Sequence, residues 1–291
     1  MRVPDWVEDP LGRYYLYFAD HKGDSIRLAH ADDIGGPYTL YPDGALGLAA
    51  SRFATETPRD IVIRGEVQRA AVVAEGYDVH FTPHIASPDV VVDDGRHRIW
   101  MSFHGLCEDG SQLTRMAVSS DGVRFEVFEP PTAFPYLRIV PRPSNGRWLA
   151  MSMPGIVYST DDLRRWTAGP MLFGNDFRHC ALLRRGPTLH VFWTRVGDAP
   201  EHILHSTIDI GGDWTASDMA TWQPAGPVSL LRPEEPWEGA DLAVEPSARG
   251  QVTAKVCQLR DPAICVDDDR VWLLYCIAGE SGIALAEITG V

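Results

Sequence analysis

The sequence contains no apolar run of about 18 residues, the length that a membrane-spanning helix needs, and no apolar leader core follows Met1. Its formal charge of −14 leaves little positive surface for a nucleic acid or an anionic membrane. The five cysteines show no Cys-x-x-Cys spacing of the kind that binds metal. Reduced core thiols are typical of a cytoplasmic protein, so we expect that location and neither a nucleic-acid nor a membrane partner.

What the sequence does have is an internal repeat. Residues 87–103 and 259–275 show the same order of features: an Asp, an apolar strand, an acidic turn, and an Arg-x-Trp strand that ends on an aromatic residue. Asp89 stands nine residues before Arg98, and Asp261 stands nine residues before Arg270. This self-similarity predicts an architecture of repeated β-hairpins.

The hairpin recurs at five places, each marked by the residue that begins its second strand: Arg13, Arg98, Arg147, Thr188 and Arg270. A third strand and a polar turn follow each hairpin. In four copies an aromatic residue follows the turn, as a short fourth strand would need: Tyr38, Phe125, Trp166 and Trp214. Such four-stranded units are typical of β-propeller blades. We therefore predict an all-β protein, a five-bladed β-propeller in a single domain.

The predicted blades cover residues 1–41, 84–130, 134–170, 176–222 and 259–291. Residues 42–83 and 215–258 leave room for further blades, so six or seven blades are the alternative. Neither segment has an aromatic-rich hairpin, and we interpret both as long insertions that could wall a substrate cleft. Because the last blade has no residues left for a fourth strand, we expect either a start upstream of Met1 or a three-stranded last blade.

In a propeller, the first strand of each blade lines the central channel and begins near the mouth where ligands bind. Counting back equally from the five hairpin markers gives these positions: Pro4 with Asp5, Asp89, Arg138, His179 after Arg178, and Asp261 after Arg260. Charged groups that converge on one axis must be paired or used, because unpaired buried charge is costly. Two interpretations stay open: Asp–Arg pairs that fasten neighbouring blades, and a functional site.

Four short phrases resemble a known group of enzymes: Tyr14–Asp20, His84–Val90, Leu259–Ala263 and Ala278–Ala286. They are similar to phrases of the five-bladed propeller glycoside hydrolases. This group includes the arabinanases and xylosidases of family 43, the fructan-cleaving family 32, and related glycosidases and glycoside phosphorylases. These phrases lie in the first, second and fifth predicted blades. It implies an enzyme that cleaves a glycosidic bond in a small-molecule or oligosaccharide substrate.

The resemblance also implies three acidic groups in the central funnel: a nucleophile or base, an acid, and a third Asp that orients or tunes. Asp89 and Asp261 match the strand-opening positions of the family, and Asp5 would be the acid of the first blade. Glycosidic cleavage needs one protonated and one ionised carboxyl group. Arg138 and His179 stand where the family commonly has an Asp and a Glu, so the identity of the general acid stays open.

Candidates for that acid are acidic or imidazole side chains elsewhere in the chain: Glu280, Glu238, Asp241, Glu245, His104 and His179. A histidine with an ordinary pKa of about 6.5 suits proton donation at neutral pH. The acidic residues from Glu238 to Glu245 could equally form a solvated loop. In the same way, His84 and His104 could be strand-end histidines that bond to the backbone.

The candidates for substrate binding are basic, acidic and aromatic side chains: Arg138, Arg178, Arg260, His84, His104, Trp237, Glu238 and Asp241. Arg138, Arg178 and Arg260 would either neutralise the carboxylates or recognise an acidic group, and Trp237 could stack on a sugar ring. We expect a glycoside hydrolase-like enzyme with funnel carboxylates. The alternatives are a carbohydrate-binding propeller without catalysis and a glycoside phosphorylase whose arginines hold phosphate. A structural calcium ion in the central channel is the one cofactor that we consider.

Overall fold

The computed structural model describes residues 1–59, 61, 63, 65–141 and 146–291. Residues 60, 62 and 64 of the first expected insertion, and 142–145 of the expected third blade, lie outside the described residues. The chain divides into two compact units. Unit 1 comprises Met1–Arg142 and Thr160–Trp166, and unit 2 comprises Pro143–Ser159 and Thr167–Val291. The fold class is confirmed: five small sheets form the blades of a five-bladed β-propeller.

The first sheet lies in unit 1 and has the order β1 (Tyr14–Phe18), β2 (Ser25–Ala31) and β3 (Thr39–Gly47). The strand expected at residues 1–5 is reduced to an isolated bridge between Arg2 and Tyr14. Because β3 continues to Gly47, residues 42–47 belong to a strand rather than to the expected insertion.

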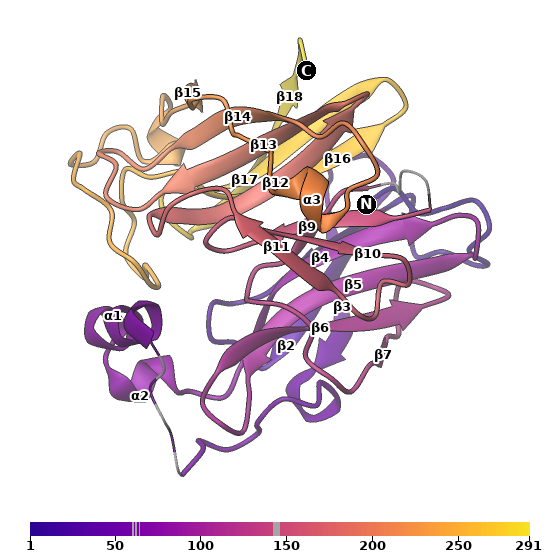
Figure 1. Cartoon of the computed structure of the whole chain (residues 1–291), viewed down its shortest axis with the longest axis horizontal. Coiled ribbons are helices and arrows are strands. Elements are labelled where there is room, and N and C mark those ends of the chain that lie inside the picture. The colour runs from indigo at the N-terminus through magenta and orange to yellow at the C-terminus, as the bar shows by residue number, and fades with distance from the viewer. Residues whose placement is uncertain (60, 62, 64, 142–145) are drawn as a thin grey trace. The chain divides into compact units, whose positions relative to one another are not determined.

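The second sheet also lies in unit 1. It consists of β4 (Ile85–Asp93), β5 (Arg98–Leu106), β6 (Gln112–Ser119) and β7 (Glu126–Val127), which are neighbours in chain order. Between the first and second sheets the described chain forms η1 (Leu48–Ala50), α1 (Gly65–Glu75) and α2 (Tyr77–His80) instead of a further blade. Figure 1 shows α1 and α2 as a helical pair between β3 and β4 in the chain.

The remaining three sheets follow in chain order, and their strands are listed here. The third sheet has β8 (Arg138–Ile139), β9 (Trp148–Ser152), β10 (Ile156–Thr160) and β11 (Thr167–Met171). The fourth sheet has β12 (Phe177–Arg185), β13 (Thr188–Arg195), β14 (Ile203–Asp209) and β15 (Val228–Leu231). The fifth sheet has β16 (Arg260–Asp267), β17 (Arg270–Ile277) and β18 (Gly282–Ile288). Within unit 2, β12, β13 and β14 run side by side (Figure 1). In the described residues the fifth sheet has three strands.

The fourth strand of the fourth blade was expected directly after Trp214, and this expectation is wrong. Trp214 is buried, and its indole N–H donates to the carbonyl of Ile210 at 2.8 Å. The chain then enters helix α3 (Ala216–Met219), because Thr215 and Asp218 form a reciprocal capping box. The strand β15 follows only at Val228–Leu231, within the segment that we interpreted as an insertion.

Aspartates recur in the polar turns because they hold the turn backbone. Asp121 Oδ1 accepts hydrogen bonds from the amides of Val123 and Arg124, at 2.8 and 2.9 Å. Asp162 Oδ1 accepts in the same way from the two amides that follow Leu163, again at 2.8 and 2.9 Å. A short side chain that satisfies two backbone donors favours a tight turn, so this repeated acid is structural.

Each unit has its own apolar core. In unit 1, the inward faces of the first two sheets bury Tyr15, Ile26, Ile99 and Phe103. In unit 2, Phe192, Leu273 and Tyr275 belong to the core of the last two sheets. All five cysteines are free thiols, and Cys180, Cys257 and Cys265 are buried. Among the described helices, none has the length and hydropathy that crossing a bilayer requires.

One close approach in unit 1 gives a test of the fold. Gly105 lies in β5, where a Cβ atom would stand 2.5 Å from the Phe53 ring and 2.6 Å from the His84 carbonyl oxygen. We expect Gly105→Ala to lower the free energy of unfolding by about 1–3 kcal/mol, because the core must shift to admit the methyl group. Urea denaturation measures this. The matched control is Gly47→Ala, whose Cβ would meet nothing within 4 Å; equal stability of the two variants would contradict the packing of β5.

Candidate functional site

A β-bulge interrupts the first strand of the second, fourth and fifth blades. The register shifts between Ala86 and Asp89, between Phe177 and Cys180, and between Arg260 and Ala263. In each case two residues of the first strand stand opposite one residue of its partner, which re-aims the side chains at the bulge. The bulge pairs are Ser87 with Pro88, Arg178 with His179, and Asp261 with Pro262.

These registers correct the predicted equivalence of Asp89 and Asp261. Asp93 pairs with Arg98, which leaves Asp94 to His97 in the turn, whereas Asp267 pairs with Arg270 and leaves only Asp268 and Asp269. Equal spacing from Arg98 and Arg270 therefore does not give equal register. The counterpart of Asp261 is Ser87, and both have a left-handed backbone with φ of 49° and 54°.

In unit 2, Arg178 of the β12 bulge and Arg260, which precedes the β16 bulge, belong to a buried network of charges. Arg178 donates from Nη1 to Glu201 Oε2 at 2.8 Å and from Nη2 to the carbonyls of Ala248 and Gly250. Arg260 lies 3.5 Å from the same Glu201 oxygen through its Nε. The side chains of Arg178, Glu201 and Arg260 are 4%, 0% and 1% exposed. These arginines are therefore paired inside the protein, with little surface left for a ligand.

Arg260 connects this network to Glu280. Its Nε and Nη2 donate to Gln258 Oε1, at 2.9 and 2.5 Å, while its Nη1 donates to Glu280 Oε1 at 2.9 Å. Glu280 lies in the turn between β17 and β18 and its side chain is 19% exposed. Burial raises the pKa of the Glu280 carboxyl, against the opposing effect of the Arg260 and Arg178 charges. Such a group can hold a proton and reach solvent.

Asp261 follows Arg260 at the start of β16. Its Oδ1 is paired with Nδ1 of His179 from the bulge of β12, and its side chain is 29% exposed. This contact brings together two predicted catalytic residues, and a third, Glu280, bonds Arg260, which directly precedes Asp261 in β16. Unit 2 therefore combines Asp261, His179 and Glu280 at one end of the fourth and fifth blades.

Asp89 lies in unit 1, where its surroundings are separate. Its Oδ2 accepts the amide of Ile139 at 2.8 Å, and Arg138 donates to the carbonyl of Ser87 at 3.0 Å. Burial raises the pKa of Asp89, and the Arg138 charge partly offsets this effect. Arg138 is buried, so it tunes a carboxylate and holds a backbone carbonyl.

His84 and His104 are also in unit 1. Both are buried, and their rings meet edge to face at a centroid separation of 5.4 Å. His84 Nδ1 bonds the carbonyl of Thr82 at 2.7 Å, the backbone role that the alternative interpretation expected. Burial lowers the pKa of His104 well below its usual range, and His84 adds to this effect. A neutral His104 lacks the proton that a general acid would give.

The other predicted residues lie apart from these groups. Asp5 is exposed and lines a pocket of about 490 Å³ with Pro4, Arg13 and Asp32. Asp241 is exposed, and the side chain of Trp237 is 53% exposed on η2 (Pro236–Glu238).

Glu238 is not part of a solvated loop. It is buried, and its carboxylate accepts the Tyr275 hydroxyl at 2.8 Å and the amides of Glu234 and Glu235 at 2.8 and 3.1 Å. With both oxygens hydrogen-bonded and the side chain buried, Glu238 stabilises η2 and has little surface for a substrate.

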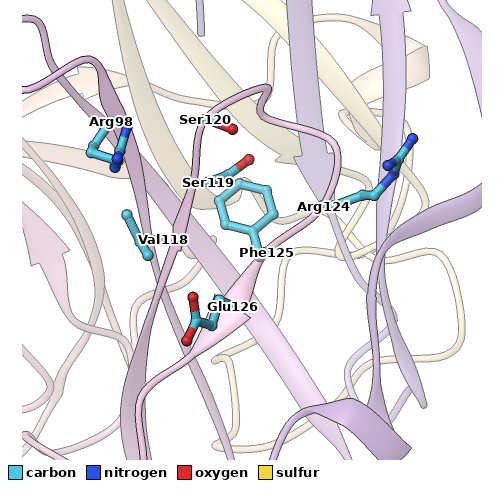
Figure 2. A pocket seen from close by; sticks show the side chains of 7 residues that line it. All are labelled: Arg98, Val118, Ser119, Ser120, Arg124, Phe125 and Glu126. Carbon is cyan, nitrogen blue, oxygen red and sulfur yellow. The ribbon is translucent and has the colours of Figure 1, made fainter.

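A further pocket of about 410 Å³ lies on the second blade, and Figure 2 shows it around Phe125 in the loop between β6 and β7. Arg98, Ser119 and Glu126 also line it (Figure 2), and none of the predicted site residues does. No group of three or more His, Cys, Asp or Glu side chains among the described residues could hold a metal ion. The described residues therefore assign no position to calcium.

Sequence reasoning missed Glu201 and Gln258. Both partner an arginine that was recognised, Glu201 with Arg178 and Gln258 with Arg260. The usable signal was charge: two arginines at buried strand starts require acceptors. The sequence does not indicate which acceptors, because Glu201 lies 23 residues after Arg178, in the connection between β13 and β14.

Comparison with known proteins supports the fold. No family model matches the chain. It is 28% identical to uncharacterized protein R118 of Acanthamoeba polyphaga mimivirus, over 99% of this chain and 82% of that protein. A β-xylosidase/α-arabinofuranosidase of family 43 from a compost metagenome, in complex with xylotriose, has a TM-score of 0.55 at 12% identity. The match covers 93% of this chain and 82% of the chain of that enzyme. An α-L-arabinanase of Cellvibrio cellulosa, complexed with arabinohexaose, has a TM-score of 0.53 at 12% identity. The match covers 94% of this chain and 87% of the arabinanase chain. The chain thus has the five-bladed β-propeller fold that these glycoside hydrolases share.

Proposed function

We propose that this protein hydrolyses a glycosidic bond, with Glu280 as the general acid and Asp261 as the ionised carboxylate. The observation that carries the proposal is the unit 2 cluster. In it Glu280, a carboxyl of raised pKa, is hydrogen-bonded to Arg260, and the next residue in the chain, Asp261, supplies a second carboxylate that is paired with His179. Glycosidic cleavage requires one carboxyl that releases a proton to the leaving oxygen and one that stays ionised. Both side chains are partly exposed, as contact with a substrate requires.

His179 serves in this proposal as the partner that orients Asp261. Its Nδ1 contacts the Asp261 carboxylate, and the left-handed backbone of Asp261 turns that side chain out of the regular strand alternation. A carboxylate fixed by one imidazole needs little reorganisation when positive charge develops on the sugar ring, and this favours the reaction. The substrate class in the proposal is an oligosaccharide, as in the complexes of the two solved glycosidases.

The two alternative functions differ in what they require of unit 2. A glycoside phosphorylase would use arginine donors to hold phosphate. Arg178 and Arg260 are instead occupied by Glu201, Gln258 and Glu280, which favours hydrolysis. Turnover that depends on inorganic phosphate would reverse this preference. Binding of an oligosaccharide with no turnover by the unaltered protein would favour a carbohydrate-binding protein.

The role of Glu280 as acid is tested by the leaving group. We expect Glu280→Gln to lower kcat/KM for 4-nitrophenyl glycosides by about 10²–10⁴-fold, because the departing oxygen loses its proton donor. The loss should be much smaller with 2,4-dinitrophenyl glycosides, because the dinitrophenolate group departs without protonation. Steady-state kinetics on a panel of aryl glycosides measures both. The matched control is Glu287→Gln, an exposed glutamate of β18 paired with Arg270, which should retain full activity. Equal losses for both leaving groups would contradict the assignment.

The sequence also predicts a catalytic role for Asp89, which lies within β4 of unit 1, and burial raises the pKa of its carboxyl. We expect Asp89→Asn to reduce kcat/KM while the protein keeps its stability, since the Asn oxygen still accepts the Ile139 amide. Asp89→Ala should in addition lose about 1–3 kcal/mol, because that buried amide is left without an acceptor. Kinetics and urea denaturation separate the two effects. Full activity of Asp89→Asn would assign Asp89 to fastening the strands alone.

A further inference from the structure

Glu201 is a fully buried carboxylate that the proposed reaction does not use. It enters the fold in the connection between β13 and β14, and its exposure is 0%. Oε2 takes Arg178 at 2.8 Å and lies 3.5 Å from Arg260. Oε1 is buried and has no hydrogen-bond partner among the described residues. A buried carboxylate with one unsatisfied oxygen is costly, so we expect its negative charge to compensate the positive charges of the arginines around it.

The charges around Glu201 form a short series. Arg178 and Arg260 carry two positive charges, Glu201 carries one negative charge, and Glu280 is the fourth member through its 2.9 Å bond to Arg260. With Glu280 ionised the series is neutral, and with Glu280 protonated it carries one positive charge. If Glu201 were neutral, both arginines would act on Glu280 without compensation and would favour its ionised form.

We propose that Glu201 is a positioning residue whose buried charge offsets Arg178 and thereby allows Glu280 to hold a proton. Glu201 does not touch the substrate, and it acts through the two arginines. This inference rests on the proposed function for its catalytic meaning. The electrostatic link from Glu201 to Glu280 stands on the contacts of Arg178 and Arg260 alone.

Several groups face Glu280 from the elements packed against it. Arg260 comes from β16 and Arg178 from β12, and the thiol of Cys276 lies in β17, where burial and the Glu280 charge raise the pKa of Cys276 to about 12. The amide of Val252 also bonds the Glu280 carboxylate. A neutral thiol and an amide do not change charge near neutral pH. Burial raises the pKa of Glu280, and the charges that oppose this are those of Arg260 and Arg178, through which Glu201 acts in this proposal.

The test is the titration of Glu280 in Glu201→Gln, a change that keeps the side-chain shape and removes the charge. We expect the titration midpoint of Glu280 to fall by about one pH unit or more, because an uncompensated nearby cation lowers a carboxyl pKa by that order. NMR of protein labelled at the glutamate carboxyl carbons measures the midpoint, and the spectrum of Glu280→Gln assigns the signal. If Glu280 is the general acid, the basic limb of the kcat/KM profile should move to lower pH by the same amount.

Two further variants separate charge from structure. Glu201→Gln combined with Arg178→Met removes one charge of each sign, so the midpoint of Glu280 should return toward that of the unaltered protein. Arg178→Met alone should raise the midpoint, and it keeps the test decisive if Glu201→Gln fails to fold. Glu238→Gln is the matched control, because it removes a buried carboxylate that is bonded to the Tyr275 hydroxyl and to the amides of Glu234 and Glu235. It should destabilise the protein with little change in the Glu280 midpoint.

The outcomes distinguish this inference from the proposed function. An unchanged Glu280 midpoint in Glu201→Gln, or a double variant that behaves like Glu201→Gln, overturns the role of Glu201 even if the protein hydrolyses glycosides. A shifted midpoint in a protein that cleaves no glycoside supports the electrostatic role and contradicts the proposed function. A shifted midpoint together with a shifted pH profile supports both.

Discussion

A β-bulge at the start of the first strand is the constraint on which the site of unit 2 depends. One extra residue in β12 and one in β16 turn Arg178 and Asp261 out of the regular alternation. Without the bulge, side chains along each strand would keep the period of two that buries Ala181 and Leu183 in the core. The bulge therefore interrupts the regular pairing and at the same point supplies polar side chains to the site. After the bulge, both hairpins pair in regular register.

Turning arginines inward creates a second requirement, because a buried guanidinium must be paired. Glu201 meets it for Arg178, while Gln258 and Glu280 meet it for Arg260. Removing one member of such a buried pair typically costs about 3–5 kcal/mol, since the other charge is left uncompensated. Stability and chemistry are therefore coupled here: the group that keeps the arginines buried also sets the charge beside the proposed acid.

Most of the fold could be predicted from the sequence, because a hairpin is specified locally by strand alternation and by turn residues. The markers Arg13, Arg98 and Arg270 predicted where three second strands begin. The strands β1, β5 and β17 begin at the marker or at the residue directly after it. The equivalence of Asp89 and Asp261 could not be predicted by counting, since turn length changes register without changing the spacing that was counted. Glu201 could not be predicted from the sequence, because its partner Arg178 lies 23 residues away. The two side chains meet only when the strands of the fourth sheet pair.

Glu280 lies in a turn, yet that turn is fixed as firmly as a strand. The amide of Gly279 donates to the carbonyl of Gln258 at 2.9 Å, and the amide of Ala278 donates to the carbonyl of Glu238 at 3.1 Å. Gln258 therefore holds the turn through its backbone and holds Arg260 through its side chain. Glu238, a candidate acid by sequence, instead supports the residue that we propose as the acid. One residue therefore holds both Arg260 and the turn that carries the Glu280 carboxyl, and such fixed placement is the preorganisation that favours proton transfer.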